Sequence, residues 1–99
     1  MSNYIKKVFY EDDDCTVTLE ELDGHLFVHV AVYEFNKAVL KKLKELWADI
    51  KNRAYMSGYD NIHTYTKDMR IVKFFKGFVK LGEFDLPTGK FEVVQWELN

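Results

Sequence analysis

Apolar and polar positions alternate along most of this 99-residue chain, and one long helical pattern interrupts the alternation. Alternation with a period of two is typical of strands that turn one face toward a core. Alternation, together with one run that is apolar on both faces, predicts strands over residues 4–10, 15–22, 26–33, 62–66, 81–86 and 91–98. Asp23-Gly24 supplies a two-residue hairpin turn, and residues 87–90, which contain a proline and a glycine, supply another.

The interruption is an amphipathic helix that begins after Asn36, a good N-cap, and stops at Gly58. Its apolar residues recur at spacings of three and four on one face: Val39, Leu43, Leu46, Trp47, Ile50 and Ala54. A second, shorter helix is predicted over residues 69–79. The long helix connects two strands, which should therefore be parallel and joined by a right-handed crossover.

The strand over residues 26–33 is apolar on both faces, so we expect it to be central and covered on both sides. The fold class that follows is α+β, with the order β-β-β-α-β-α-β-β. Its sheet is mixed and mostly antiparallel, with one parallel crossover. We predict one domain over residues 1–99, because a chain of this length has enough residues for one core and too few for two.

Apolar residues make up 47% of the chain and aromatic residues 16%, which is more than disordered chains contain. The sequence shows neither a signal peptide nor an apolar run long enough to cross a membrane, so we expect a soluble, cytoplasmic protein. Cys15 is the one cysteine, and it therefore has no partner for an intrachain disulfide.

The net charge of −2 hides an uneven distribution. Residues 1–35 are acidic, whereas residues 36–80 carry eleven Lys and Arg against four Asp and Glu. Solvated helix faces commonly carry lysines, and this is the simpler interpretation. Aromatic residues among these lysines could stack on bases, but the acidic segment would repel a phosphate backbone, so we expect no nucleic-acid partner.

Three histidines raise the question of a metal site. His25 and His29 share a strand face but lie four residues apart, too far to bind one ion together. His63 belongs to the neighbouring parallel strand, and the sequence shows no third ligand beside it. We therefore predict no metal, and His29 or His63 is a better candidate for a general base.

The element order and the residues at its joints resemble the GNAT (GCN5-related N-acetyltransferase) fold without its N-terminal strand and first helices. Residues 68–75, DMRIVKFF, look like the family's N-x-R-A-I-x-F-Y run, and residues 93–98 look like its closing strand. The resemblance implies a V-shaped opening between strands 26–33 and 62–66, where family members receive acetyl-CoA. It also implies cofactor-binding residues: Val32, Tyr33, Phe35, Asn36, Lys37, Ala38, Asp68 and Arg70.

The chain departs from this family at two places that matter for chemistry. The family's pyrophosphate loop, Q/R-x-x-G-x-G/A, falls at residues 34–39, EFNKAV, which contain neither glycine. The tyrosine that protonates the leaving thiolate in the family falls at Phe75, which has no hydroxyl. If the chain is active, His63 and Tyr65 are the catalytic candidates.

Two hypotheses follow. The first is a non-catalytic GNAT-like pseudoenzyme, similar to small tailed-phage proteins such as an internal virion protein, which binds no acetyl-CoA and acts on a host protein or within a virion. It works through protein contacts and forms a possible homodimer. The second is an acetyl-CoA-dependent N-acetyltransferase with an atypical pyrophosphate loop.

Overall fold

The computed structural model describes residues 4–98, so the predicted domain over residues 1–99 extends beyond the described part at both ends. Within this range the chain forms six strands and two helices. In chain order they are β1 (Tyr4–Glu11), β2 (Cys15–Leu22), β3 (His25–Val32), α1 (Lys37–Met56), β4 (Asn61–Thr66), α2 (Met69–Val72), β5 (Val79–Leu86) and β6 (Gly89–Glu97).

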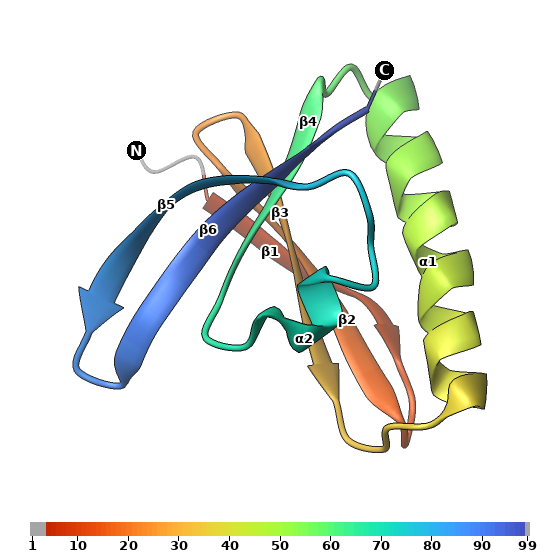
Figure 1. Ribbon diagram of the computed structural model, residues 1–99. Coiled ribbons are helices and arrows are strands. Elements are labelled where there is room, and N and C mark those ends of the chain that lie inside the picture. Colours follow the sequence, from red (N-terminus) through yellow and green to blue (C-terminus); the bar gives the residue numbers. More distant parts are fainter. Residues whose placement is uncertain (1–3, 99) are drawn as a thin grey trace.

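The strands form one mixed sheet in the order β1-β2-β3-β4-β6-β5 (Figure 1). β3 and β4 are parallel, with Phe27 opposite His63, and the other neighbouring strands are antiparallel. The turn at Asp23 and Gly24 has positive φ at both residues, 51° and 83°, as a tight hairpin between β2 and β3 requires. The predicted fold class and the parallel crossover are confirmed.

The helix α1 packs along the sheet because its apolar stripe is continuous (Figure 1). Val39, Leu43, Ile50 and Ala54 are buried against residues of β2, β3, β4 and β6. α2 lies on this same side, since Phe75, just after it, contacts both the helix and the sheet through a cluster with Trp47 and Trp96. Both helices therefore cover one face of the sheet.

The second predicted helix, over residues 69–79, is wrong in length, because α2 ends at Val72. The backbone tightens to three-residue hydrogen bonds at Phe74 and Phe75, and Gly77 then takes a φ of 91°. The carbonyl of Phe75 accepts instead from the indole of Trp96 at 2.8 Å. A helix that continued to residue 79 would need this carbonyl for its own ladder.

The prediction that β3 is covered on both sides is also wrong. Within residues 4–98 no helix lies on the face opposite α1. We call this face the open face, and its side chains alternate with the core side chains on each strand. It contains Val8, Thr18, Glu20, Leu22, His25, Phe27, His29, His63, Tyr65, Val79, Phe84, Leu86, Phe91, Val93 and Gln95.

Candidate functional site

The start of α1 is held by hydrogen bonds from within the chain. The side chain of Asn36 accepts from the amide of Val39 at 3.0 Å, as predicted for an N-cap. The amides of Tyr33 and Glu34 both donate to the carbonyl of Asp14, at 2.7 and 3.3 Å. The junction from Val32 to Ala38 is therefore fixed to the turn between β1 and β2.

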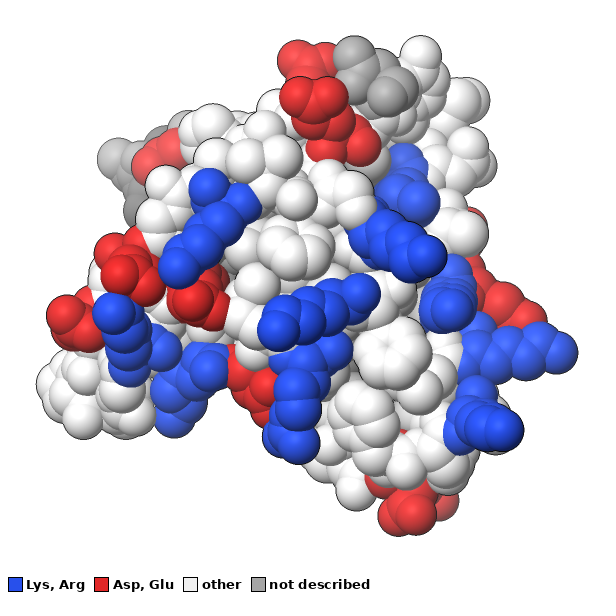
Figure 2. Space-filling view, in the orientation of Figure 1, with Lys and Arg blue, Asp and Glu red and all other residues white. Residues whose placement is uncertain are grey.

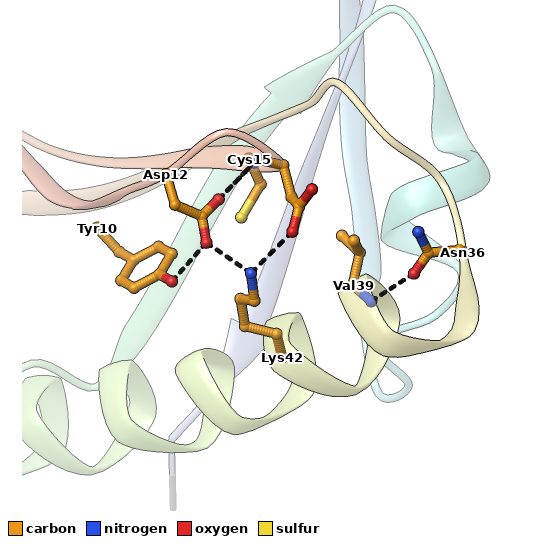
Figure 3. Close-up of polar contacts among 7 residues, drawn as sticks. Tyr10, Asp12, Cys15, Asn36, Val39 and Lys42 are labelled. Carbon is orange, nitrogen blue, oxygen red and sulfur yellow. Dashed lines mark hydrogen bonds and ion pairs between the residues drawn. The ribbon is translucent and has the colours of Figure 1, made fainter.

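That turn, Asp12 to Asp14, is an ordered structure and not only a solvated acidic run (Figure 3). Asp12 Oδ1 accepts from the amides of Asp14 and Cys15, while Asp12 Oδ2 accepts from the Tyr10 hydroxyl at 2.5 Å. Lys42, in the second turn of α1, bridges Asp12 at 2.5 Å and Asp14 at 3.1 Å. The Lys42 ammonium and the Tyr10 hydroxyl lower the pKa of Asp12, and the two carboxylates raise the pKa of Lys42.

These contacts decide how well the helix start fits a pyrophosphate. A phosphate bound at a helix N-terminus needs free backbone amides that it can approach closely. Here the amides of Tyr33, Glu34 and Val39 donate to oxygen atoms of the chain, whereas those of Phe35, Asn36, Lys37 and Ala38 have no acceptor within residues 4–98. Asp12 and Asp14, which pair with Lys42 in the second turn of α1, also place two carboxylates near this helix start. The engaged amides and the two aspartates count against a pyrophosphate at this junction.

An apolar cavity of about 110 Å³ lies between the C-terminal halves of β3 and β4, where the two parallel strands diverge. α1 and the segment from Ile71 to Phe75 close it on the helix side. His29 and Tyr65 line it from the open face. The hydroxyl of Thr64 donates to the carbonyl of Val28 at the point of divergence. This position corresponds to the V-shaped opening that the GNAT resemblance implies.

A buried carboxylate lies on the open face next to this cavity. Glu20 Oε1 accepts from His29 Nε2 at 3.3 Å, and Glu20 also interacts with the hydroxyl of Tyr65. The imidazole and phenol rings contact each other edge to face at 4.6 Å. Burial and the Glu20 carboxylate raise the pKa of Tyr65, so the hydroxyl keeps its proton at neutral pH.

His63, the other catalytic candidate, faces oxygen atoms on both sides of its ring. Its Nε2 lies 3.1 Å from Gln95 Oε1, and its Nδ1 lies 3.4 Å from the carbonyl of Leu26. Gln95 is itself oriented by donating to Asn61 at 3.0 Å. This arrangement disfavours His63 as a general base, because a base needs a free lone pair directed at its substrate. Its catalytic role stays a prediction.

The remaining site candidates pair with each other at the start of α2. Asp68 caps the helix by accepting from the amide of Arg70 at 2.9 Å, and its carboxylate also accepts from the guanidinium at 2.6 Å. The guanidinium lowers the pKa of Asp68 to about 2. Both side chains are exposed. Phe75, where the family has its tyrosine, is buried against Trp47.

No group of three or more His, Cys, Asp or Glu side chains in residues 4–98 is arranged to hold a metal ion. His25 and His63 do come together, with ring centroids 5.6 Å apart, but the described residues supply no third ligand. The helices of the described range are also too short or too polar to cross a bilayer.

The fold has a known counterpart. The chain superposes on a protein from Agrobacterium tumefaciens described as a "putative acetyltransferase", with a TM-score of 0.64 and 16% sequence identity. The match covers 97% of this chain and 75% of that one. The 99-residue chain therefore has a GNAT-like fold. At such low identity the likeness extends to the fold alone, and no protein-family model or curated sequence matches the chain.

Sequence reasoning missed two parts of this region. Glu20 belongs to an acidic pair beside a hairpin turn, which is typical of exposed residues, yet it is buried. The strand period places Glu20 on the open face with Thr18, so its burial comes from neighbouring side chains on that face, including Phe27, His29 and Tyr65. Asp12 and Lys42 are thirty residues apart, and the sequence carries no signal that they pair.

Proposed function

We propose that this protein is a non-catalytic GNAT-like protein, of the small tailed-phage kind, that acts through protein contacts made by the open face of its sheet. The observation that carries the proposal is the row of aromatic and aliphatic side chains on that face. Apolar sheet faces of this size are normally covered in folded proteins, and uncovered ones mark interaction surfaces. The first partner we assign to it is a second copy of the chain.

A continuous ring ladder supports this role. Phe27 contacts Tyr65 at 5.9 Å, Tyr65 contacts Phe84 at 5.8 Å, and Phe84 stacks on Phe91 at 5.4 Å. The ladder crosses the sheet from β3 to β5, and exposed aliphatic residues flank it at both edges: Val8, Leu22, Val79 and Leu86. A rigid aromatic centre is the usual composition of an interface core.

The area of the open face suits a homodimer. Six strands spaced about 4.8 Å apart and about 26 Å long give a face of roughly 750 Å². Two copies packed face to face would then bury roughly 1,500 Å², which is within the usual range of about 1,200 to 2,000 Å² for a stable interface. Face-to-face packing of two sheets is also a common arrangement in β-sandwiches.

We propose that the protein is non-catalytic because of the contacts at the start of α1 and the phenylalanine at position 75. The backbone amides of Tyr33, Glu34 and Val39 donate to Asp14 and Asn36, so these three are not available to a phosphate group. Phe75 has no hydroxyl to donate to a leaving thiolate. The open face and the start of α1 lie on opposite faces of the sheet. A helix start that does not bind acetyl-CoA therefore leaves the contacts of the open face unchanged.

Sedimentation velocity with a matched pair of variants tests the proposal. Val8 and Ile5 are both exposed on β1, by 54% and 63%, but Val8 lies on the open face and Ile5 on the opposite one. We expect the wild type and Ile5→Lys to sediment as dimers of the 11.8 kDa chain, and Val8→Lys as a monomer. A monomeric wild type, or equal dissociation of both variants, would contradict the proposal.

A second candidate, an N-acetyltransferase, is favoured by one observation. The cavity between β3 and β4 is apolar, and His29 and Tyr65 border it with Glu20 behind them. A histidine oriented by a buried carboxylate can accept a proton, and the Tyr65 phenol is protonated and can donate one, although its raised pKa makes it a weaker acid. The engaged amides at the helix start count against this candidate.

A mass-spectrometric screen separates the two. The protein is incubated with acetyl-CoA and three acceptor classes: polyamines, amino acids and lysine peptides. The non-catalytic proposal predicts no acetylated product above the level of a reaction without protein. Transfer that is lost in His29→Gln but kept in the neighbouring surface variant His25→Gln would overturn it in favour of the enzyme.

A further inference from the structure

The helix α1 has a line of lysines on the flank that faces α2. Lys37, Lys41, Lys44 and Lys51 follow one another at spacings of four, three and seven residues, which brings them onto one side of the helix. The line spans about 21 Å at the rise of an α-helix. Like charges three and four residues apart destabilise a helix by a few tenths of a kcal/mol per pair, so the fold itself gains nothing from them.

The segment after α2 extends this line into a surface. Lys73 and Lys76 flank Phe74 and Phe75 in the sequence. Lys44 Nζ, from α1, is 5.9 Å from the centre of the Phe74 ring. Phe74 is 40% exposed, although it is a large apolar side chain. We call these six lysines, together with Phe74, the lysine surface. Figure 2 shows Lys and Arg side chains gathered over the region of α1 and α2.

The charges of the lysine surface are not compensated. Among residues 4–98, none of its six lysines forms an ion pair, whereas the cations that do so lie elsewhere: Lys42, Arg53, Arg70, Lys80 and Lys90. Three acidic residues of the chain's first third are engaged away from these lysines. Asp12 and Asp14 pair with Lys42, and Glu20 is buried on the open face.

Asp12 and Asp14 lie on the helix side of the sheet, but their charges are paired with Lys42, which weakens the sequence argument that the acidic segment repels a nucleic acid. In the folded chain the lysine surface and the open face lie on opposite sides of the sheet. A polyanion on the lysine surface would therefore meet ammonium groups first. A dimer formed through the open face would leave the surface accessible in both copies.

We infer that the lysine surface binds single-stranded nucleic acid without sequence preference. A positively charged track supplies phosphate contacts, and an exposed aromatic ring supplies a stacking platform for a base. Phe74 provides such a ring between lysines, and Tyr55, which is exposed and follows Lys51 by one helical turn, provides a second. A lysine ammonium is a point charge and makes no bidentate hydrogen bonds to the edge of a base. The binding is therefore independent of the base sequence.

Fluorescence anisotropy with a labelled oligothymidine tests the inference. The affinity should fall steeply with salt, with a slope of about −3 to −4 for four to six phosphate contacts. Lys44→Gln/Lys73→Gln should weaken binding and make the slope shallower by about 1.4, because two contacts are lost. Lys7→Gln/Lys90→Gln removes the same charge from β1 and β6, outside both the lysine surface and the open face, and should bind as the wild type does.

Phe74→Ala tests the stacking contact without changing charge. We expect affinity for oligothymidine to fall about five- to 150-fold, as when a stacking aromatic residue is removed, with an unchanged salt slope. Circular dichroism checks that each variant is folded. Absence of binding at low salt, equal loss in the two lysine variants, or competition by poly-glutamate as strong as by oligothymidine would each overturn the inference.

Discussion

The hydrogen bond from the Trp96 indole to the Phe75 carbonyl holds the segment after α2 against the sheet, and Trp96→Phe removes it. The bond is 2.8 Å long and buried, and Trp96 is 4% exposed. A buried carbonyl without a donor costs about 1 to 3 kcal/mol. The smaller ring also leaves space beside Trp47, which adds about 1 kcal/mol. We therefore expect a loss of about 2 to 4 kcal/mol in the free energy of unfolding.

Urea unfolding followed by far-UV circular dichroism measures this loss. With a slope of about 2 kcal/mol per M, the midpoint should fall by about 1 to 2 M. Trp47→Phe is the matched control, because it makes the same change in the same aromatic cluster, and the Trp47 indole donates no hydrogen bond within residues 4–98. If Trp96→Phe costs no more than Trp47→Phe, the indole does not hold the segment after α2.

Three further predictions concern the turn and the helix start. Asn36→Ala should lower the free energy of unfolding by about 1 kcal/mol in urea titration, because the amide of Val39 loses its cap, whereas Asn36→Asp should keep most of it. The lowered pKa of Asp12 means that its charge stabilises the fold above its ordinary pKa and stops doing so as the pH falls through the folded value. The difference in melting temperature between wild type and Asp12→Asn should therefore narrow below about pH 4. Burial raises the pKa of the Cys15 thiol, so a thiol reagent should modify it slowly at neutral pH and rapidly in urea; fast labelling of the native protein would show that the thiol is accessible.

The elements with strong local signals were predicted correctly. β2 matches its predicted range, and α1 starts after the N-cap Asn36 and ends one residue before the C-cap Ser57, with Gly58 at a φ of 93°. The error in α2 has a tertiary cause. Residues 69–79 have helical periodicity, but the chain needs the Phe75 carbonyl for Trp96, which is twenty-one residues away. A pattern of neighbouring residues contains no information about such a contact.

The candidate site was predicted in outline and not in detail. Strand alternation places Tyr65 on a face of β4, but only the fold shows that Glu20 of β2 and His29 of β3 meet it there. The missing glycines at the start of α1 were visible in the sequence. That Asp14 takes up the amides of Tyr33 and Glu34 depends on how the turn between β1 and β2 packs against the helix.

Thermal unfolding in the presence of acetyl-CoA tests the central claim, that this GNAT-like fold works without the cofactor, most directly. A ligand at one hundred times its Kd stabilises the folded state by about 2.7 kcal/mol, which would raise the melting temperature of a domain of this size by about 10 to 20 °C. We predict no saturable shift at physiological salt. A saturable rise of that size would show that the start of α1 accommodates a pyrophosphate after all, and it would contradict the account.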